Sequence, residues 1–288
     1  MRIPRLGKKL LKGITTSFSE MDDAQIKLFA RRHAFAGYTR LQHENGGSGR
    51  PVCTRHHCID WNYVGVPRPR PNKWYVEMHP DQNTWKEWAY AKDDFDQHYY
   101  WERWERLQKD GNGNGFVLAL RKERNENDDR DGIIVVVGDH FNYILGRDMS
   151  GKEKKTFDKS STVDLVDAAI DAGDRTTAET YLSIDAGHGL ISKGWEIDCA
   201  LQHWKEGSKF FADASIQGSD IDSCKIFIDK CTWEVYECSV DLKDLETVLQ
   251  WKGNSSDGHF DFDSILLGSI GKKRNATCIE TTTVPKRR

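Results

Sequence analysis

The chain has 288 residues, 38% of them hydrophobic and 30% charged, and a formal net charge of −3. It contains no run of about 18 apolar residues, so we expect no membrane-spanning helix. The charge is uneven: residues 1–19 and 272–288 each carry +5, which leaves −13 on the rest of the chain. Because an acidic body repels a phosphate backbone, the charge pattern excludes nucleic-acid binding through that body.

The seven cysteines are scattered along the chain, and their number is odd. The N-terminus lacks the apolar core of a secretory signal peptide, so we expect reduced thiols and a cytoplasmic or nuclear protein. Residues 1–19 are basic and free of acids, which also suits a mitochondrial presequence. That alternative is less favoured, because Pro4, Gly7 and Gly13 weaken an amphipathic helix.

Three segments have helical patterns. Residues 21–32, at the end of the basic N-terminal segment 1–32, place Ile26, Phe29 and Ala30 on one side. Residues 162–172 follow Ser161 and residues 242–251 follow Asp241, and both Ser and Asp are typical N-caps. The sequence therefore predicts three short helices that lie far apart in the chain.

Strand patterns dominate the rest of the chain. Residues 116–122 and 132–138 are rich in β-branched residues and flank a polar loop, which predicts a hairpin. Residues 194–207 are expected to add a strand, since Trp195, Ile197, Cys199 and Leu201 alternate. Further strands are predicted at 140–147, 224–229 and 231–240. Short successive strands with hairpin turns indicate a mainly β protein with antiparallel sheets, as a barrel or sandwich.

A polar, glycine-containing stretch at 148–160 suggests a domain boundary. We expect a first β-barrel domain at 33–150, a second β-rich domain at 160–271 and a basic tail at 272–288.

Two clusters contain metal-ligand residue types. The stretch CTRHHCID brings Cys53, His56, His57 and Cys58 close in sequence, and HFDFDS offers His259, Asp261 and Asp263 on one strand face. The first lacks a second ligand pair, and its adjacent histidines point to opposite sides of a strand. The second is explained equally by a solvated polar face. We therefore expect no metal and no cofactor.

The region 74–104 contains ten aromatic rings in 31 residues, among seven acidic side chains. This local charge disfavours base stacking, which needs a basic groove. Alternation places rings on both faces of the strand HYYWERWERL, as in the wall of a barrel with an aromatic interior. Such an interior could hold an apolar small molecule. The candidate lining residues are Trp88, Tyr100, Trp101, Trp104 and Tyr143.

Several stretches in this order resemble the first half of the fungal Hri family. They are HAFAGYTR at 33–40, HHCIDWN at 56–62, EMHPD at 77–81, YYWERWERL at 99–107, and GFVLALRKE followed by DGIIVVVGDHFNYILGR, which ends at 147. The resemblance implies two lipocalin-like β-barrels in tandem and no established activity, and it supplies no catalytic or binding residues. The family's opening strands have no counterpart in residues 1–32, and the second half of this chain is longer than the family pattern.

These observations predict a non-enzymatic intracellular module that binds a hydrophobic small molecule or a protein partner. An alternative is a barrel enzyme of the cyclase or isomerase type, acting on a hydrophobic metabolite. It would need a titratable side chain inside the barrel, and the candidates are His98, Glu102 and His140. A third alternative is attachment to a membrane surface through the basic residues 1–19.

Overall fold

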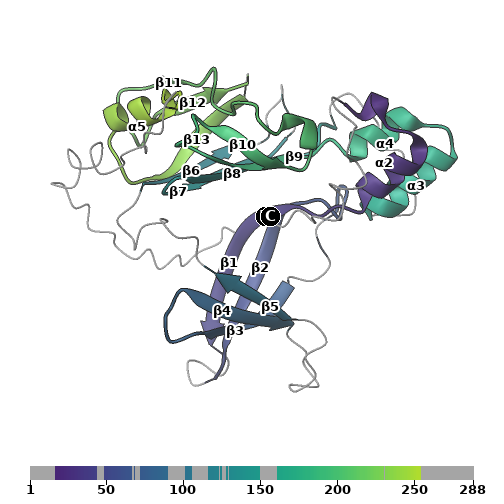
Figure 1. Cartoon of the computed structure of the whole chain (residues 1–288), viewed down its shortest axis with the longest axis horizontal. Coiled ribbons are helices and arrows are strands. Elements are labelled where there is room, and N and C mark those ends of the chain that lie inside the picture. The colour runs from purple at the N-terminus through teal and green to yellow at the C-terminus, as the bar shows by residue number, and fades with distance from the viewer. Residues whose placement is uncertain are drawn as a thin grey trace, which may run out of the picture.

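The computed structural model describes residues 17–43, 49–66, 68, 72–89, 101–105, 116–122, 124, 128, 130–149, 161–229 and 231–253. In this part of the chain the protein is mainly β, with two antiparallel sheets and four short α-helices (Figure 1). The predicted fold class is therefore confirmed at the level of a mainly β, antiparallel protein.

The first sheet is a five-stranded meander, in which each strand pairs with the next along the chain. Its strands are β1 (Phe35–His43), β2 (Pro51–Asp60), β3 (Asn72–Met78), β4 (Thr84–Ala89) and β5 (Trp101–Glu105). In Figure 1 this sheet lies below the second sheet, and β1 and β2 lead from it towards the helices.

The second sheet has eight strands in the order β10-β9-β8-β7-β6-β13-β12-β11. The strands are β6 (Val117–Lys122), β7 (Gly132–Val137), β8 (His140–Leu145), β9 (Asp185–Leu190), β10 (Glu196–Ala200), β11 (Ser215–Gln217), β12 (Lys225–Ile228) and β13 (Cys231–Cys238). The predicted hairpin is confirmed, since Val117 pairs with Val137 and Lys122 with Gly132. This sheet combines strands from both sides of the polar stretch 148–160.

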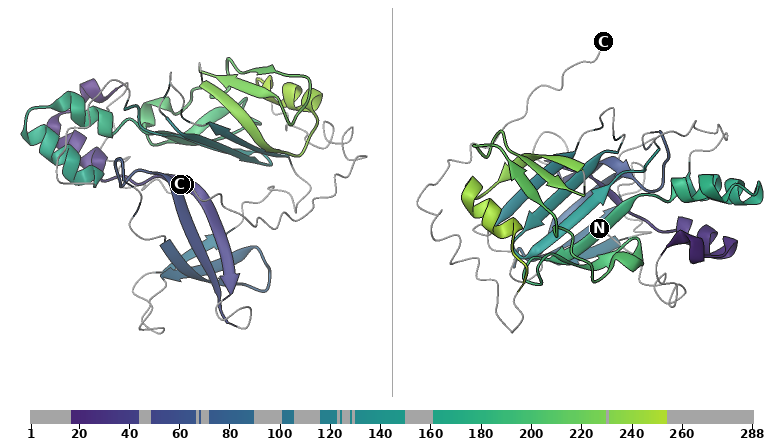
Figure 2. Two further views of the ribbon diagram at one scale, coloured as in Figure 1. Left: turned by 180° about the vertical axis from the view of Figure 1, so that it is seen from behind. Right: turned by 90° about the horizontal axis from the view of Figure 1, so that it is seen from above.

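The helices are α2 (Asp23–Ala30), α3 (Thr162–Asp171), α4 (Arg175–Tyr181) and α5 (Leu242–Leu249), with short 3₁₀ turns η1 (Phe18–Glu20) and η3 (His203–Lys205). The two predicted N-caps are confirmed: Ser161 accepts a hydrogen bond from the Asp164 amide and Asp241 from the Asp244 amide. Figures 1 and 2 show α2, α3 and α4 side by side, at the end of the molecule opposite α5.

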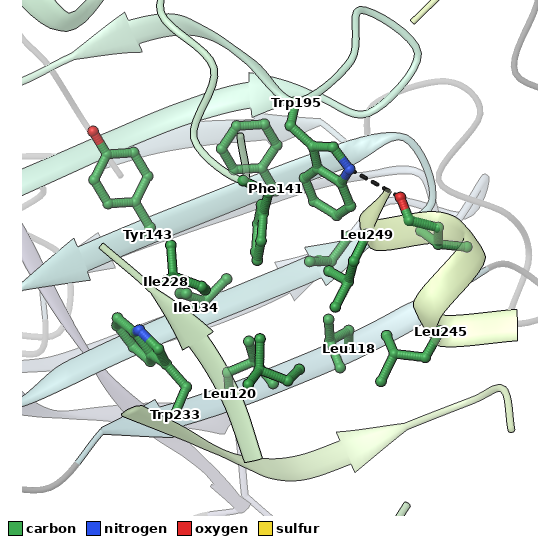
Figure 3. Packing of buried hydrophobic residues seen from close by; sticks show 14 of the residues in the cluster. Leu118, Leu120, Ile134, Phe141, Tyr143, Trp195, Ile228, Trp233, Leu245 and Leu249 are labelled. Atoms are coloured by element: carbon green, nitrogen blue, oxygen red, sulfur yellow. Dashed lines mark hydrogen bonds between the residues drawn. The ribbon is translucent and has the colours of Figure 1, made fainter. Parts of the chain in front are cut away.

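The inner face of the eight-stranded sheet covers a large aromatic and aliphatic core. Leu118, Ile134 and Phe141 point into it, and α5 closes one end (Figure 3). The indole of Trp195 donates a hydrogen bond of 3.0 Å to the carbonyl of Val248 in α5. Because this interior is filled by the protein's own side chains, α5 is fixed against the sheet by packing and by this hydrogen bond.

Two glycines in β9 explain how the rings of β8 fit. A Cβ at Gly187 would lie 2.4 Å from the Tyr143 ring, and one at Gly189 would lie 2.4 Å from the Phe141 ring. Each aromatic side chain therefore lies across a glycine of the neighbouring strand, where no side chain blocks it.

A second core lies between the helices, the start of β1, the end of β2 and the outer face of β8 and β9. Its largest fully buried side chain is Trp61, whose indole donates to the Ala30 carbonyl at 2.9 Å. Phe29 of α2 and Ile144 of β8 belong to the same cluster. This core therefore connects the five-stranded sheet, the helices and the eight-stranded sheet.

The expectation of lipocalin-like barrels is not confirmed. In the described part of the chain, β1 and β5 remain edges of one sheet, and β10 and β11 remain edges of the other. A short five-stranded meander cannot close without pairing its outer strands.

The expected strand at 194–207 is shorter than predicted. β10 covers only Glu196–Ala200, and a bulge between Ile197 and Cys199 shifts its register with β9. Because a bulge changes which side chains share a face, Ile197 lies in the inner core while Cys199 pairs with His188 on the outer face. The four residues therefore do not line one face, as simple alternation suggests.

Candidate functional site

The candidate site is one face of the five-stranded sheet. Cross-strand pairing places Cys53 opposite both Leu41 and Trp74, and Trp85 opposite both Met78 and Trp104. Alternation adds Arg55 and Glu87 to the same side. Val76 and Glu102 pair with Glu87 and lie on this side too. We call this surface the tryptophan face; its residues include Leu41, Cys53, Arg55, Trp74, Val76, Met78, Trp85, Glu87, Glu102 and Trp104.

An ion pair between Arg55 and Glu87 lies at the centre of the tryptophan face. The side chains are 15% and 5% exposed, and a guanidinium nitrogen of Arg55 donates to one oxygen of the Glu87 carboxylate. The other oxygen accepts a hydrogen bond of 2.9 Å from the indole of Trp85. Both oxygens of a buried carboxylate are therefore satisfied, as a desolvated charge requires.

Indole rings flank the cation of this pair. The guanidinium carbon of Arg55 lies 5.6 Å from the ring centroid of Trp74 and 5.3 Å from that of Trp104. These distances are within the range of cation–π attraction. Arg55 on β2 thus reaches a ring on β5, three strands away, and its side chain fills the middle of the face.

Trp85 and Trp104 present parallel rings beside the ion pair. Their centroids are 5.9 Å apart and their planes differ by 5°. The indole nitrogen of Trp104 is buried and has no hydrogen-bond acceptor in the described residues. An unsatisfied buried donor costs about 1–3 kcal/mol, so an acceptor supplied from outside would stabilise this ring.

Burial also affects the thiol on this face. Desolvation raises the pKa of Cys53, and the nearby Glu87 charge acts in the same direction, while the Arg55 charge opposes it. Cys53 therefore behaves as a small apolar side chain in the wall of the site.

The opposite face of the sheet carries a second set of rings. Tyr75 and Trp88 are buried together with Val52, whereas Trp101 is 56% exposed. The ammonium of Lys86 lies 5.6 Å from the Trp88 centroid and 5.5 Å from that of Trp101.

The structure does not bring the five predicted lining residues together. Trp88 and Trp101 lie on one face of the five-stranded sheet, and Trp104 lies on the other. Tyr143 belongs to the core of the eight-stranded sheet, where its ring stacks on Phe210 at 4.0 Å and its hydroxyl donates to Asp185. Tyr100 is outside the described residues.

The alternative catalytic candidates are also separated. Glu102 lies opposite Glu87 on the five-stranded sheet, while His140 is on β8 of the eight-stranded sheet, with its Nδ1 3.1 Å from Nε2 of His188. His98 is outside the described residues.

The histidines of CTRHHCID point to opposite sides, as alternation predicts. His56 stacks on Tyr38 at 4.6 Å, and Nδ1 of His57 lies 2.7 Å from the Asp60 carboxylate. Cys53 is buried and Cys58 is exposed. In the described part of the chain no three His, Cys, Asp or Glu side chains are grouped as metal ligands. The HFDFDS cluster is outside that part.

Sequence reasoning missed the centre of the tryptophan face. Arg55 belongs to the CTRHHCID stretch, which was considered as a metal site, and Glu87 is one of the seven acids in the aromatic region 74–104. The sequence did not indicate that these two side chains form an ion pair. The available signal was the lone acid between two tryptophans in WKEW at 85–88. Its partner could not be identified, because the register of β2 against β4 through β3 is a non-local property.

No family model matches the chain, and no curated protein matches it. One similar solved structure is an uncharacterized protein from Saccharomyces cerevisiae, YLR301w. It is 13% identical, with a TM-score of 0.41, over 78% of this chain and 83% of that chain.

The helices within the described residues are all too short or too polar to cross a lipid bilayer.

Proposed function

We propose that the protein is a non-enzymatic binding module whose tryptophan face holds a flat, apolar small molecule. The observation that carries this proposal is the set of three indoles around a recessed Arg55–Glu87 pair. Ring faces supply apolar contact area, and a few fixed polar groups orient the ligand. Leu41 and Met78 are exposed on the same face and extend its apolar area.

The lipocalin-like architecture implied by the family resemblance is compatible with this proposal but is not required by it. In lipocalins the ligand lies inside a closed barrel. Here the eight-stranded sheet has its own filled core, which favours the five-stranded sheet for ligand binding.

The probe for this proposal is phenylnaphthylamine, a flat uncharged fluorophore whose emission rises in apolar sites. We expect wild-type protein to bind it with energy transfer from tryptophan, and the W104A variant to bind at least about tenfold more weakly. The matched control is W101A, which removes the same side chain from the same strand on the opposite face. Equal binding by W104A and wild type, or an equal loss in W101A, would contradict the tryptophan face as the site.

A second candidate function is protein binding through the opposite face. Trp101 and Tyr38 are 56% and 55% exposed there, and aromatic side chains are enriched at protein interfaces. Cross-linking followed by mass spectrometry in a eukaryotic extract tests it. A partner captured by wild type and W104A, but not by W101A, supports protein binding; capture that W101A does not affect argues against it.

A further inference from the structure

A second group of reactive side chains lies on the outer face of the eight-stranded sheet, away from the tryptophan face. Cys199 of β10 pairs directly with His188 of β9. Directly opposite residues in an antiparallel pair have Cβ atoms about 4.5–5.5 Å apart and share one face. His188 in turn pairs with Asn142, and that residue with Val135, which is exposed. This row of side chains is therefore on the outer face.

The imidazole of His188 is fixed by a second histidine. Its Nε2 lies 3.1 Å from Nδ1 of His140, and the two rings are stacked at 5.3 Å. One of these nitrogens donates and the other accepts, so the orientation of the His188 ring is defined. When Nε2 of His188 is the donor to His140, Nδ1 of His188 is unprotonated, and the imidazole opposite Cys199 can take up a proton there.

A buried cation approaches the same thiol from the helical side. Arg32, which follows α2, is 6% exposed, and its Nη1 donates to the carbonyl of Leu201, two residues after Cys199. Burial lowers the pKa of Arg32 to about 10, and the charges of Glu206 and Cys199 oppose that effect. The guanidinium therefore has two anionic groups in its field: a carboxylate and the thiolate form of Cys199.

One nitrogen of this guanidinium, whose carbon lies 4.4 Å from the centroid of the Phe29 ring, has no hydrogen-bond partner in the part of the chain that the structure describes. Nη2 of Arg32 is buried and has no hydrogen-bond acceptor among those residues. An orphaned buried donor is costly in the resting state and stabilises an anion that forms beside it. Glu206, the competing anion, uses its Oε1 to accept from the Ala200 amide at 3.1 Å.

We propose that Cys199 is a modification site, a reactive thiol that takes small uncharged electrophiles, with Arg32 stabilising its anion and His188 accepting its proton. Cys199 is only partly buried, so a small molecule can reach it. In the reaction with iodoacetamide, the sulfur–carbon bond forms as the carbon–iodine bond breaks. Iodide leaves, and the thiol proton passes to His188 and then to solvent. Reactive cysteines have this combination of positive charge and partial exposure.

The test measures the alkylation rate of each cysteine in the full chain, using iodoacetamide and peptide mass spectrometry at neutral pH. Cys58 is the internal control, because the residue is exposed but its thiol has a raised pKa. Partial desolvation of the thiol raises this pKa and the Asp131 charge adds to the effect, while the Arg121 charge opposes it. We expect Cys199 to react about tenfold faster than Cys58. A rate for Cys199 equal to or below that of Cys58 would overturn the proposal.

Two variants at the charges that face Cys199 should act in opposite directions. R32M removes the cation and should slow Cys199 about tenfold, whereas E206Q removes the competing anion and should speed it about threefold. The side-chain amide introduced by E206Q retains an oxygen that can accept from the Ala200 amide, so this variant is expected to fold even if R32M does not. Slower or unchanged alkylation of Cys199 in E206Q would exclude electrostatic activation.

Discussion

At the scale of single residues, Glu87 has the largest predicted effect on the five-stranded sheet. Its carboxylate is 5% exposed and accepts from both Arg55 and Trp85. Removing one partner of a buried ion pair costs about 3–5 kcal/mol, because the other charge is left uncompensated. We expect E87A to lower the free energy of unfolding by that amount, as measured by urea denaturation followed by tryptophan fluorescence.

The control for E87A is the double variant R55L/E87L, which removes both charges together. Replacing a whole buried pair by apolar side chains is often close to neutral. The double variant should therefore be more stable than E87A. If it is less stable, the ion pair itself contributes stability beyond the cost of an orphaned charge.

The carboxyl of Asp60 should make the free energy of unfolding depend on pH in the acid range. Burial alone would raise the pKa of this carboxyl, but hydrogen bonds from His57, the Asn62 amide and Arg68 outweigh it and lower the pKa to about 2. Because the folded pKa lies below the unfolded value of 3.8, these bonds stabilise the fold fully above about pH 4. Their contribution, on the order of 2 kcal/mol, is lost as the pH falls towards 2.

The D60N variant has no carboxyl to titrate, so it lacks this contribution at every pH. The difference in unfolding free energy between wild type and D60N should therefore shrink between pH 4 and pH 2 by on the order of 2 kcal/mol. Chemical denaturation at several pH values measures it. D198N, at an exposed aspartate, changes the net charge equally and serves as the control. A constant difference between wild type and D60N across this range would contradict the assignment.

At the scale of elements, Arg147 connects segments that are distant in sequence. It follows β8, and burial lowers its pKa to about 10 against the opposing charge of Asp60. It donates hydrogen bonds to the carbonyls of Asp60, Trp61, Tyr63 and Tyr181 and to the hydroxyl of Thr162. The end of β2, the start of α3 and the end of α4 therefore all depend on one guanidinium.

We expect R147M to destabilise the protein by at least about 3 kcal/mol, because several buried carbonyls lose their donor at once. Thermal and urea unfolding measure this loss. R124M is the matched control, since Arg124 is 67% exposed and its ion pair with Asp131 should contribute no more than about 1 kcal/mol. Similar losses in the two variants would show that Arg147 does not join these elements.

The sequence predicted most elements because their signals are local. Ser161 and Asp241 mark two helix starts, and the β-branched run at 132–138 marks strand β7. Helix α4 was missed: RTTAETY is rich in β-branched threonine and has no clear apolar stripe, and its stability comes from burial of Tyr181 against neighbouring helices. Beyond the hairpin of β6 and β7, strand partners far apart in sequence were not predictable, because pairing β6 with β13 depends on tertiary packing.

The same distinction applies to the candidate site. Local alternation correctly separated Trp101 from Trp104, which lie on opposite faces of β5. It could not reveal that Arg55, from a strand three places away, packs against Trp104. The expected barrel lining nevertheless included both Trp101 and Trp104, whereas the structure places these rings on two different faces of the five-stranded sheet.

At the scale of the whole molecule, the two sheets differ in the burial that supports them. Strands β6–β8 contribute Leu118, Ile134 and Phe141 to a core that also includes α5, and all three side chains are fully buried. In the described part of the five-stranded sheet, the buried cluster consists of Val52, Tyr75 and Trp88. Because local stability follows buried apolar area, β3–β5 should open at lower free energy than β6–β8.

Hydrogen–deuterium exchange with peptide mass spectrometry tests this difference. Amides of β6–β8 should exchange only through global unfolding, while those of β3 and β4 should exchange faster and respond more weakly to a mutation in the large core. L118A, which opens a cavity in that core and costs about 2–5 kcal/mol, should accelerate exchange in β6–β8 far more than in β3 and β4. If all these strands accelerate equally, the two sheets unfold as one cooperative unit, and the second core around Trp61 transmits stability between them. Separate responses would mean that the tryptophan face can open or adjust around a ligand while the eight-stranded sheet stays folded.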